Sequence, residues 1–283
     1  MVKQTCRIYG VLGYPVKHSL SPLMHNAAFR ALKINAQYCL FEVSPKKLKD
    51  FFLNLKEKNI FGLNVTIPYK EKVIPFLDKL SDEAKLIKAV NTIVRTKDDK
   101  LIGFNTDGEG FLRHLRSDLK FNPYGKKIAI LGAGGASRAI LVYLARTKPK
   151  IIKVYDIVEE KAKKLINYLK KIFKNIDFKV AQSILELDIL DADLLINATP
   201  VGMKETDPVL VKEEFLHKNL LVYDLIYNPV QTKLLASAKK RGARASNGLG
   251  MLLYQGMASF EHFTQKKAPL KIMKMALEAE RSG

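Results

Sequence analysis

The sequence predicts an α/β protein with two domains: an N-terminal mixed α/β domain and a doubly wound, Rossmann-type domain. Three observations support this fold class. Short apolar strands alternate with amphipathic helical segments along the chain. A glycine-rich turn at residues 132–137 stands directly between a strand and a helix. The length of 283 residues suits two domains, each able to bury its own core.

The N-terminal domain is expected to begin with two strands, near residues 6–12 and 36–43, and a helix between them. Ser21 and Pro22 form a helix start, with the serine as N-cap and the proline at the first helical position. The positive end of this helix, with the hydroxyls of Ser19 and Ser21 beside it, suits a carboxylate ligand. Ordinary helix capping is the alternative explanation for the serines.

A third strand, near residues 60–67, carries polar side chains that folding alone does not require. A period of two puts Asn64 and Thr66 on one face and places Ile67 on the apolar face, and the following proline should end the strand. Lys70 comes soon after, where α/β proteins usually keep their chemistry. The alternative is an edge strand followed by a solvated lysine.

A hairpin is expected next, with arms at residues 90–96 and 101–105, followed by a helix from Gly108. Residues 121–125 resemble a linker, and a second series of strands and helices starts after it. The strands of this second series are expected at residues 127–131, 151–156, 193–198 and 220–225.

The glycine-rich turn indicates a dinucleotide site. It keeps the first two glycines of the G-x-G-x-x-G pattern, and Ser137 stands in the third position. Amide groups at the start of the following helix are suited to bind a pyrophosphate. Asp156 ends the next strand, where an acidic residue accepts hydrogen bonds from the ribose hydroxyls. A Rossmann-like domain without a nucleotide is the alternative.

The formal net charge of +20 does not by itself indicate a nucleic-acid-binding protein. Lysines in the helix around residues 161–171 stand on its solvated faces, whereas its apolar side chains share one side: Ala162, Leu165, Ile166 and Leu169. Aromatic residues do not alternate with these lysines as a single-strand platform requires. A basic surface that attracts an anionic substrate and cofactor is the better interpretation.

The N-terminal residues lack the pattern of a signal peptide, and no apolar run is long enough to cross a membrane. Cys6 and Cys39 form neither a CxxC motif nor a disulfide framework, so we expect reduced thiols and a cytoplasmic protein. A monomer or a homodimer is expected, with no nucleic acid and no membrane as partner.

Eight ordered motifs resemble those of the shikimate dehydrogenase family. They occupy residues 13–26, 64–70, 89–92, 103–108, 132–139, 197–203, 224–229 and 248–256. The resemblance implies reversible reduction of 3-dehydroshikimate to shikimate with a nicotinamide cofactor, in chorismate and aromatic amino acid biosynthesis. It also implies a substrate domain of residues 1–107, rejoined by C-terminal helices at 248–283, and a Rossmann cofactor domain of residues 108–247.

Carried over position by position, the resemblance implies that Lys70 and Asp107 are catalytic and also contact the substrate. The other implied substrate ligands are Ser19, Ser21, Asn64, Thr66, Asn91, Tyr227 and Gln255. The implied cofactor ligands are Gly132, Ala133, Gly134, Gly135, Ala136, Asp156, Thr199, Leu225, Gly248 and Met251. No metal is implied.

One departure from the family concerns the cofactor. Members that use NADP, the family's usual cofactor, commonly carry Asn-Arg-Thr after the second Rossmann strand, but this chain has Asp156-Ile157-Val158. Two like charges about 4 Å apart repel by ~4 kcal/mol at an effective dielectric of about 20. The sequence therefore predicts a preference for NAD, unless Lys153 or Lys161 restores binding of the 2′-phosphate.

Two alternatives to a biosynthetic shikimate dehydrogenase stay open. An NAD-dependent quinate/shikimate dehydrogenase would share the same residues, and nothing in them separates the two substrates. A non-catalytic sensor that binds a nucleotide and a shikimate-like ligand is the alternative from another class. The presence of both Lys70 and Asp107 argues against the sensor, because binding alone needs no proton donor.

Overall fold

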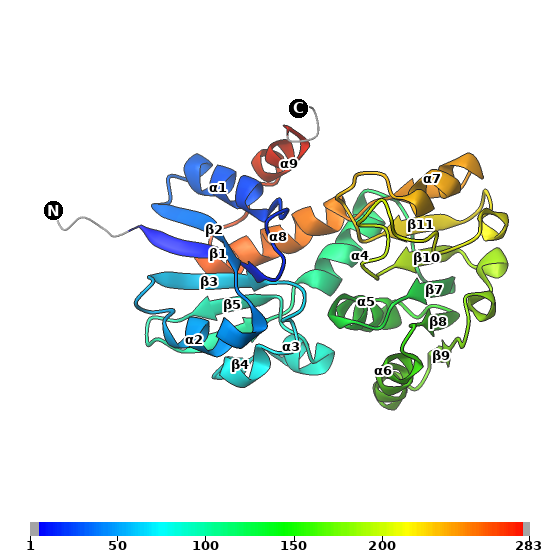
Figure 1. Ribbon diagram of the computed structural model, residues 1–283, viewed down its shortest axis with the longest axis horizontal. Coiled ribbons are helices and arrows are strands. Elements are labelled where there is room, and N and C mark those ends of the chain that lie inside the picture. Colours follow the sequence, from blue (N-terminus) through cyan, green and yellow to red (C-terminus); the bar gives the residue numbers. More distant parts are fainter. Residues whose placement is uncertain (1–5, 280–283) are drawn as a thin grey trace. The chain divides into compact units, whose positions relative to one another are not determined.

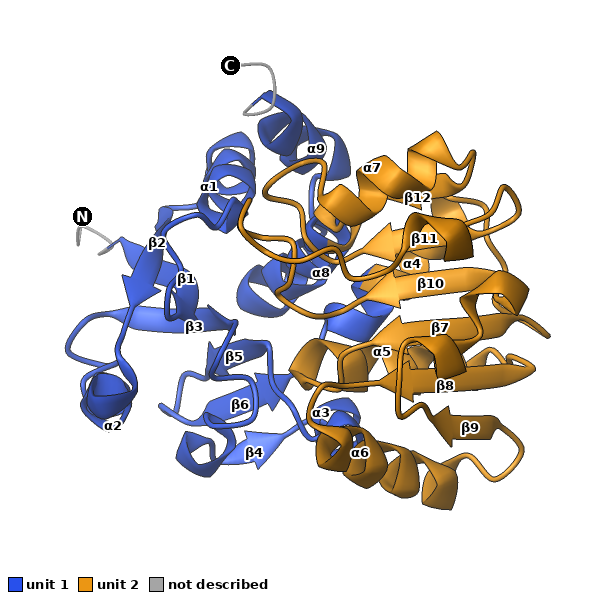
Figure 2. Ribbon diagram, turned by 45° about the vertical axis from the view of Figure 1, so that its right-hand side comes forward, with its two compact units in different colours: residues 1–110, 252–283 blue, residues 111–251 orange. Residues whose placement is uncertain are grey.

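The computed structural model describes residues 6–279. The chain forms two compact units, one made of residues 1–110 and 252–283 and the other of residues 111–251 (Figure 2). The chain leaves the first unit within helix α4 (Asp107–Ser117) and returns to it within helix α8 (Leu249–Thr264). Each unit contains its own β-sheet with helices packed on it, so the predicted α/β class is confirmed.

The sheet of the first unit is mixed, in the order β2-β1-β3-β5-β6-β4. Strand β1 runs parallel to β2 and β3, whereas β5 is antiparallel to both β3 and β6. The predicted hairpin is confirmed as β5 and β6, with Thr92 opposite Phe104. The strands are β1 (Arg7–Gly13), β2 (Ala36–Glu42), β3 (Ile60–Val65), β4 (Lys79–Leu80), β5 (Thr92–Arg95) and β6 (Leu101–Phe104).

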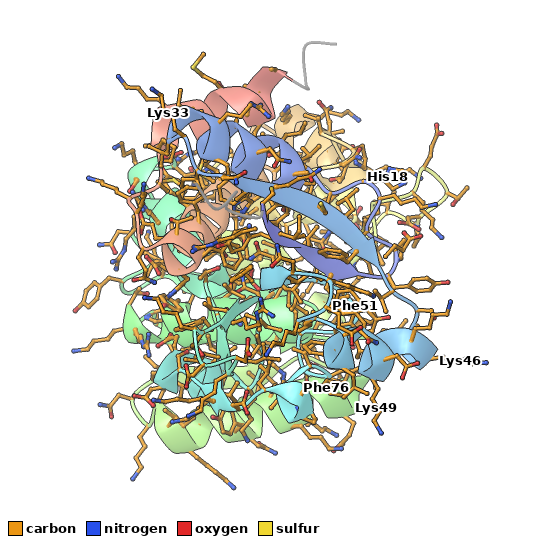
Figure 3. The ribbon with its side chains drawn as sticks, turned by 90° about the vertical axis from the view of Figure 1, so that its left-hand side faces the viewer. His18, Lys33, Lys46, Lys49, Phe51 and Phe76 are labelled. Atoms are coloured by element: carbon orange, nitrogen blue, oxygen red, sulfur yellow. The ribbon has the colours of Figure 1, made fainter. Side chains whose placement is uncertain are left out.

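Helices cover both faces of this sheet. Helices α1 (Ser21–Ala31) and α9 (Leu270–Ala279) pack against each other on one side, and α2 (Leu48–Leu53) and α3 (Asp82–Ile87) lie on the other (Figure 1). Beneath α2, an apolar cluster contains Phe51 and receives Phe76, whereas Lys46 and Lys49 point outward (Figure 3). The 3₁₀ helices are η1 (Pro45–Lys47), η2 (Ile74–Phe76), η3 (Leu185–Leu187), η4 (Ile189–Asp191) and η5 (Glu213–Phe215).

The third strand ends earlier than predicted. Strand β3 stops at Val65, and Ile67 is 59% exposed, so its predicted place on the apolar face was wrong. The N–H of Thr66 still donates to the Leu12 carbonyl, but the chain then turns and the N–H of Tyr69 donates back to the Thr66 carbonyl at 2.9 Å. The turn buries Tyr69 in the core in place of Ile67.

The helix start at Ser21 also differs from its prediction by one residue. Helix α1 begins at Ser21 itself, the cap position is Leu20, and Pro22 occupies the second helical position. No side chain caps this helix, and the Ser21 N–H instead donates to the Ser19 hydroxyl at 3.3 Å. The predicted N-cap role of Ser21 was therefore wrong, although the helix itself was correctly placed.

The sheet of the second unit is parallel, in the order β12-β11-β10-β7-β8-β9, which is a doubly wound arrangement. Helix α6 (Glu159–Ile172) buries the four apolar residues that its periodicity predicted. Helices α5 (Gly135–Arg146) and α7 (Lys233–Lys240) complete this unit. Its strands are β7 (Lys127–Leu131), β8 (Ile151–Tyr155), β9 (Asp177–Val180), β10 (Leu194–Asn197), β11 (Leu221–Asp224) and β12 (Arg244–Ser246). Within residues 6–279, no helix combines the length and apolar character needed to cross a bilayer.

Candidate functional site

A partly buried ion pair lies at the centre of the polar cluster in the first unit. Lys70 follows the turn after β3, and Asp107 is the first residue of α4. The Lys70 Nζ and Asp107 Oδ2 atoms are 2.5 Å apart, and only 15% and 5% of the two side chains are exposed. The positive end of α4 further favours the charged carboxylate. The arrangement holds an ammonium group, a possible proton donor, in a fixed position.

Asn91 connects this ion pair to helix α8. Its Nδ2 group donates to Asp107 Oδ1 at 2.9 Å and lies 3.3 Å from Gln255 Oε1. Its Oδ1 atom accepts from the Thr106 N–H at 2.8 Å, which fixes the orientation of the amide. The side chain of Asn91 is therefore held between two of the residues that the sequence predicted as substrate ligands.

Asn64 joins the same cluster from the end of β3, where it is 5% exposed. Its Oδ1 atom accepts from the Tyr38 hydroxyl at 2.7 Å, and its Nδ2 group donates to Ser259 Oγ at 2.8 Å. Tyr38 and Ser259 were not singled out from the sequence. Ser259 follows Gln255 by four residues, one turn of the helix, and this spacing is the signal that was available.

The remaining predicted substrate ligands are less closely connected. Among residues 6–279, no hydrogen bond joins Ser19, Ser21 or Thr66 to the cluster around Asn91. Ser19 and Ser21 lie together at the start of α1, and Thr66 packs against Gly13 on β1. Tyr227 belongs to the second unit.

The glycine-rich turn of the second unit contains two glycines with different roles. Gly132 has a φ of +98°, and a Cβ atom there would come within 3.0 Å of the Thr199 side chain, so the fold itself requires glycine. Gly134 caps α5 with ordinary dihedrals, and no heavy atom of the described chain beyond its immediate neighbours lies within 4 Å of a Cβ added to it. Open space therefore lies beside Gly134 at the start of α5, where a bound pyrophosphate would need it.

Ser137, which stands at the third glycine position, fits that position because its hydroxyl is satisfied internally. It is fully buried, and its Oγ atom donates to the Gly132 carbonyl at 2.6 Å. The serine therefore holds the turn against the helix without projecting into the open space.

Asp156 is fixed at the end of β8 by two backbone amides. Its Oδ2 atom accepts from the Ala133 N–H at 2.7 Å, and its Oδ1 atom accepts from the Val158 N–H at 2.9 Å. The first bond connects the carboxylate directly to the glycine-rich turn. The neighbouring Ile157 is 90% exposed, so an apolar side chain stands beside the carboxylate.

The other predicted cofactor ligands follow the strands of the second unit. Thr199 comes after β10 and Leu225 after β11, and because these strands are parallel to β7 their carboxyl ends share one edge of the sheet. Gly248 packs so closely that an added Cβ would come 2.0 Å from the Leu225 carbonyl oxygen. Met251 lies in the first turn of α8.

Three buried polar residues to which the sequence analysis gave no role support this edge: Asn197, Asp224 and Thr232. Asn197 donates from Nδ2 to Asp224 Oδ1 at 3.0 Å and accepts from the Thr199 hydroxyl at 2.7 Å. The Thr232 hydroxyl donates to Asp224 Oδ2 at 2.7 Å. Burial raises the pKa of Asp224, and these donors oppose that effect. The hydrogen bonds among Asn197, Asp224 and Thr232 hold the loops that carry Thr199 and Leu225.

Comparison with known proteins identifies the family. The family description "Shikimate dehydrogenase substrate binding domain" matches residues 11–93, and "Shikimate 5'-dehydrogenase C-terminal domain" matches residues 248–278. A shikimate dehydrogenase (NADP(+)) from Methanopyrus kandleri is 45% identical over 278 residues, which cover 95% of this chain and 94% of the relative.

Two solved structures agree with this result. The shikimate dehydrogenase of Aquifex aeolicus has a TM-score of 0.88 at 39% identity, with 98% of this chain and 99% of that chain covered. The shikimate 5-dehydrogenase of Listeria monocytogenes, in complex with shikimate and NAD, has a TM-score of 0.84 at 36% identity, with 96% of each chain covered. The ordered motifs, the two sheets and these full-length similarities show that the chain belongs to the shikimate dehydrogenase family.

Proposed function

We propose that the protein is a shikimate dehydrogenase that interconverts 3-dehydroshikimate and shikimate in chorismate biosynthesis. The observation that carries this proposal is the partly buried Lys70–Asp107 pair, which Asn91 joins to Gln255 and to Asn64 through hydrogen bonds. A hydroxyl-rich ring needs several fixed donors and acceptors next to the group that moves its proton, and the cluster supplies both. We place the reaction in the cytoplasm, in keeping with free thiols and a nicotinamide cofactor.

Lys70 is the proposed acid–base group. A nicotinamide cofactor held at the glycine-rich turn of residues 132–137 would supply the hydride that reduces the carbonyl carbon. The Lys70 ammonium stabilises the charge that develops on the carbonyl oxygen and donates a proton to it, and Asp107 holds the ammonium in place. In the oxidising direction the same nitrogen takes the proton back. General acid catalysis of this kind typically contributes ~10²–10⁴-fold to the rate.

The proposed ligands divide between the two units. Ser19 and Ser21 at the start of α1 would bind the substrate carboxylate, with Tyr227 contributing from the second unit. The ring hydroxyls would be bound by the remaining ligands, which are Asn64, Thr66, Asn91, Asp107 and Gln255. The first unit is therefore proposed as the substrate domain, and the second unit, with the glycine-rich turn, as the cofactor domain.

We further propose that NAD is preferred over NADP. The carboxylate of Asp156 is held by two amides beside the glycine-rich turn, and a 2′-phosphate would meet its charge. The repulsion of ~4 kcal/mol at about 4 Å, even if halved by screening, corresponds to roughly tenfold discrimination or more. Lys153 already pairs with Asp188 at 3.3 Å, which limits its use as a phosphate ligand. The Listeria monocytogenes relative binds NAD, whereas the Methanopyrus kandleri relative is named for NADP.

Initial rates of nicotinamide reduction, with shikimate or quinate as substrate and NAD or NADP as cofactor, test these proposals together. Strong activity with shikimate and NAD, and little with NADP, is the expected result. Higher efficiency with quinate would favour the quinate/shikimate dehydrogenase alternative. Equal efficiency with both cofactors would contradict the role given to Asp156, and no turnover with any pair would favour the non-catalytic sensor.

A further inference from the structure

We propose that Ser259 is a positioning residue that locks the substrate-binding side chains of the first unit to helix α8. This proposal rests on the proposed function, because it concerns the residues to which shikimate would bind. Ser259 is fully buried and lies on α8, one turn after Gln255. Its hydroxyl lies within hydrogen-bond distance of four groups: Asn64 Nδ2 (2.8 Å), Thr92 Oγ1 (2.8 Å), Gln255 O (2.9 Å) and Thr106 Oγ1 (3.2 Å).

The chemistry of the partners fixes the direction of these bonds. The Nδ2 group of Asn64 also lies 3.1 Å from the main-chain carbonyl oxygen of Asn91. Because a carbonyl oxygen can only accept, the Asn64 amide must point its N–H groups toward Asn91 and Ser259. The hydroxyl of Ser259 donates to the Gln255 carbonyl and therefore accepts from Asn64. On the far side of the amide, the Tyr38 hydroxyl donates to Asn64 Oδ1. The orientation of the Asn64 amide is thus determined at both ends.

Ser259 connects three segments of the unit through this one oxygen. Asn64 lies on β3, Thr92 begins β5, and Thr106 immediately precedes the catalytic Asp107. The Thr106 hydroxyl also lies 3.1 Å from the Gln255 carbonyl, and the Thr92 hydroxyl lies 2.9 Å from Asn91 Oδ1. Three proposed substrate ligands, Asn64, Asn91 and Gln255, are therefore each bonded to Ser259 or to one of its hydroxyl partners.

The catalytic pair touches this network through Asn91, which donates to Asp107, and not through Ser259 itself. Within residues 6–279, no hydrogen bond joins Ser259 to Lys70 or to Asp107. Removing the hydroxyl would leave a buried Asn64 N–H without its shortest acceptor and loosen the ligands while Lys70 and Asp107 stay paired. We expect Ser259→Ala to raise the KM for shikimate ~10-fold, to change kcat less than ~3-fold and to leave the KM for the nicotinamide cofactor unchanged.

Helix α8 offers a matched control. The Thr264 hydroxyl donates to the Phe260 carbonyl at 2.8 Å, the same four-residue back-bond as Ser259 makes, but its other hydrogen bonds go to Lys266. Thr264→Ala should leave the KM for shikimate unchanged. Ser259→Cys provides a second variant that leaves no cavity, because its side chain is slightly larger than serine, but that hydrogen-bonds weakly, and it should raise the KM as alanine does.

The experiment measures steady-state kinetics of the full-length wild type, Ser259→Ala, Ser259→Cys, Thr264→Ala, Asn64→Ala and the Asn64→Ala/Ser259→Ala double variant, with thermal unfolding of each. Since Ser259 acts through Asn64, Ser259→Ala should raise the KM for shikimate much less in the Asn64→Ala background than in the wild-type background. An unchanged KM in both Ser259 variants, or full additivity with Asn64→Ala, would overturn the proposal. A wild type without shikimate turnover would refute the proposed function instead.

Discussion

Asp156 carries the proposed choice between NAD and NADP, because its carboxylate is fixed by the amides of Ala133 and Val158. Asp156→Asn keeps the shape and one acceptor oxygen but removes the charge. We predict that the ratio of kcat/KM with NADP to that with NAD rises ~10-fold or more, as the lost repulsion requires. Asp177→Asn, at the start of β9, serves as the control and should not change the ratio. An unchanged ratio in Asp156→Asn would show that the charge does not select the cofactor.

Side chains of the site differ in how visible they are in the sequence. Asn64 and Lys70 could be predicted as site residues because folding alone does not require an amide at a strand end or a lysine close behind it. Ser259 and Thr92 could not, because a serine in a helix and a threonine in a strand are ordinary residues for those elements. Their role depends on which hydroxyls the fold brings together, and the spacing of Ser259 from Gln255 is the one local signal that points to it.

At the scale of elements, the two glycines before α5 should respond differently to the same substitution. Gly132→Ala introduces a side chain at a φ of +98° and 3.0 Å from Thr199, so we predict a loss of about 1–2 kcal/mol in unfolding free energy. Gly134→Ala meets no atom of the described chain and should keep the wild-type stability, but its methyl group stands where a pyrophosphate would approach α5.

Urea unfolding and the KM for NAD distinguish the two variants. Gly134→Ala should raise the KM for NAD at least several-fold with a normal unfolding midpoint, and Gly132→Ala should lower that midpoint. If Gly134→Ala leaves the KM for NAD unchanged, the cofactor does not bind against the start of α5. If it destabilises the fold as much as Gly132→Ala, the site at Gly134 is not open.

Helices and strands were predictable where the hydrophobic pattern repeats over enough residues to identify its period. Helix α6 shows four apolar residues on one face over its length, and the structure buries all of them. The edge strands β9 and β12 were missed because they are short: β12 has three residues, and β9 buries only Phe178. The turn after Val65 was missed because the apolar Ile67 continued the strand pattern, while Tyr69 made the better core contact.

At the scale of the whole molecule, His25 should make stability depend on pH. It is fully buried and stacks on Tyr38 at a centroid distance of 4.2 Å, and neither ring nitrogen has a hydrogen-bond partner within the described residues. Burial lowers the pKa of His25 to about 3. In the unfolded chain the His25 pKa is ~6.5, so between about pH 6.5 and about pH 3 the unfolded chain binds a proton at His25 and the folded chain does not. The free energy of unfolding therefore falls as the pH drops through this range.

Between pH 8 and pH 5 this single group should lower the free energy of unfolding by about 2 kcal/mol. The measurement is urea unfolding of the wild type and of His25→Phe at both pH values, since the variant removes the titrating group but keeps an aromatic ring. His18→Phe, on an exposed loop (Figure 3), is the control and should keep the wild-type pH dependence. An identical pH dependence in His25→Phe and the wild type would show that His25 is not kept neutral.

The central claim is that Lys70 moves the proton in shikimate oxidation. The most direct test compares kcat and KM for shikimate in the wild type, in Lys70→Ala and in Lys72→Ala, an exposed lysine two residues further along. We predict that Lys70→Ala lowers kcat by ~10²–10⁴-fold while the KM for shikimate changes only a few-fold, and that Lys72→Ala behaves as the wild type. A Lys70→Ala variant with an unchanged kcat would contradict the account.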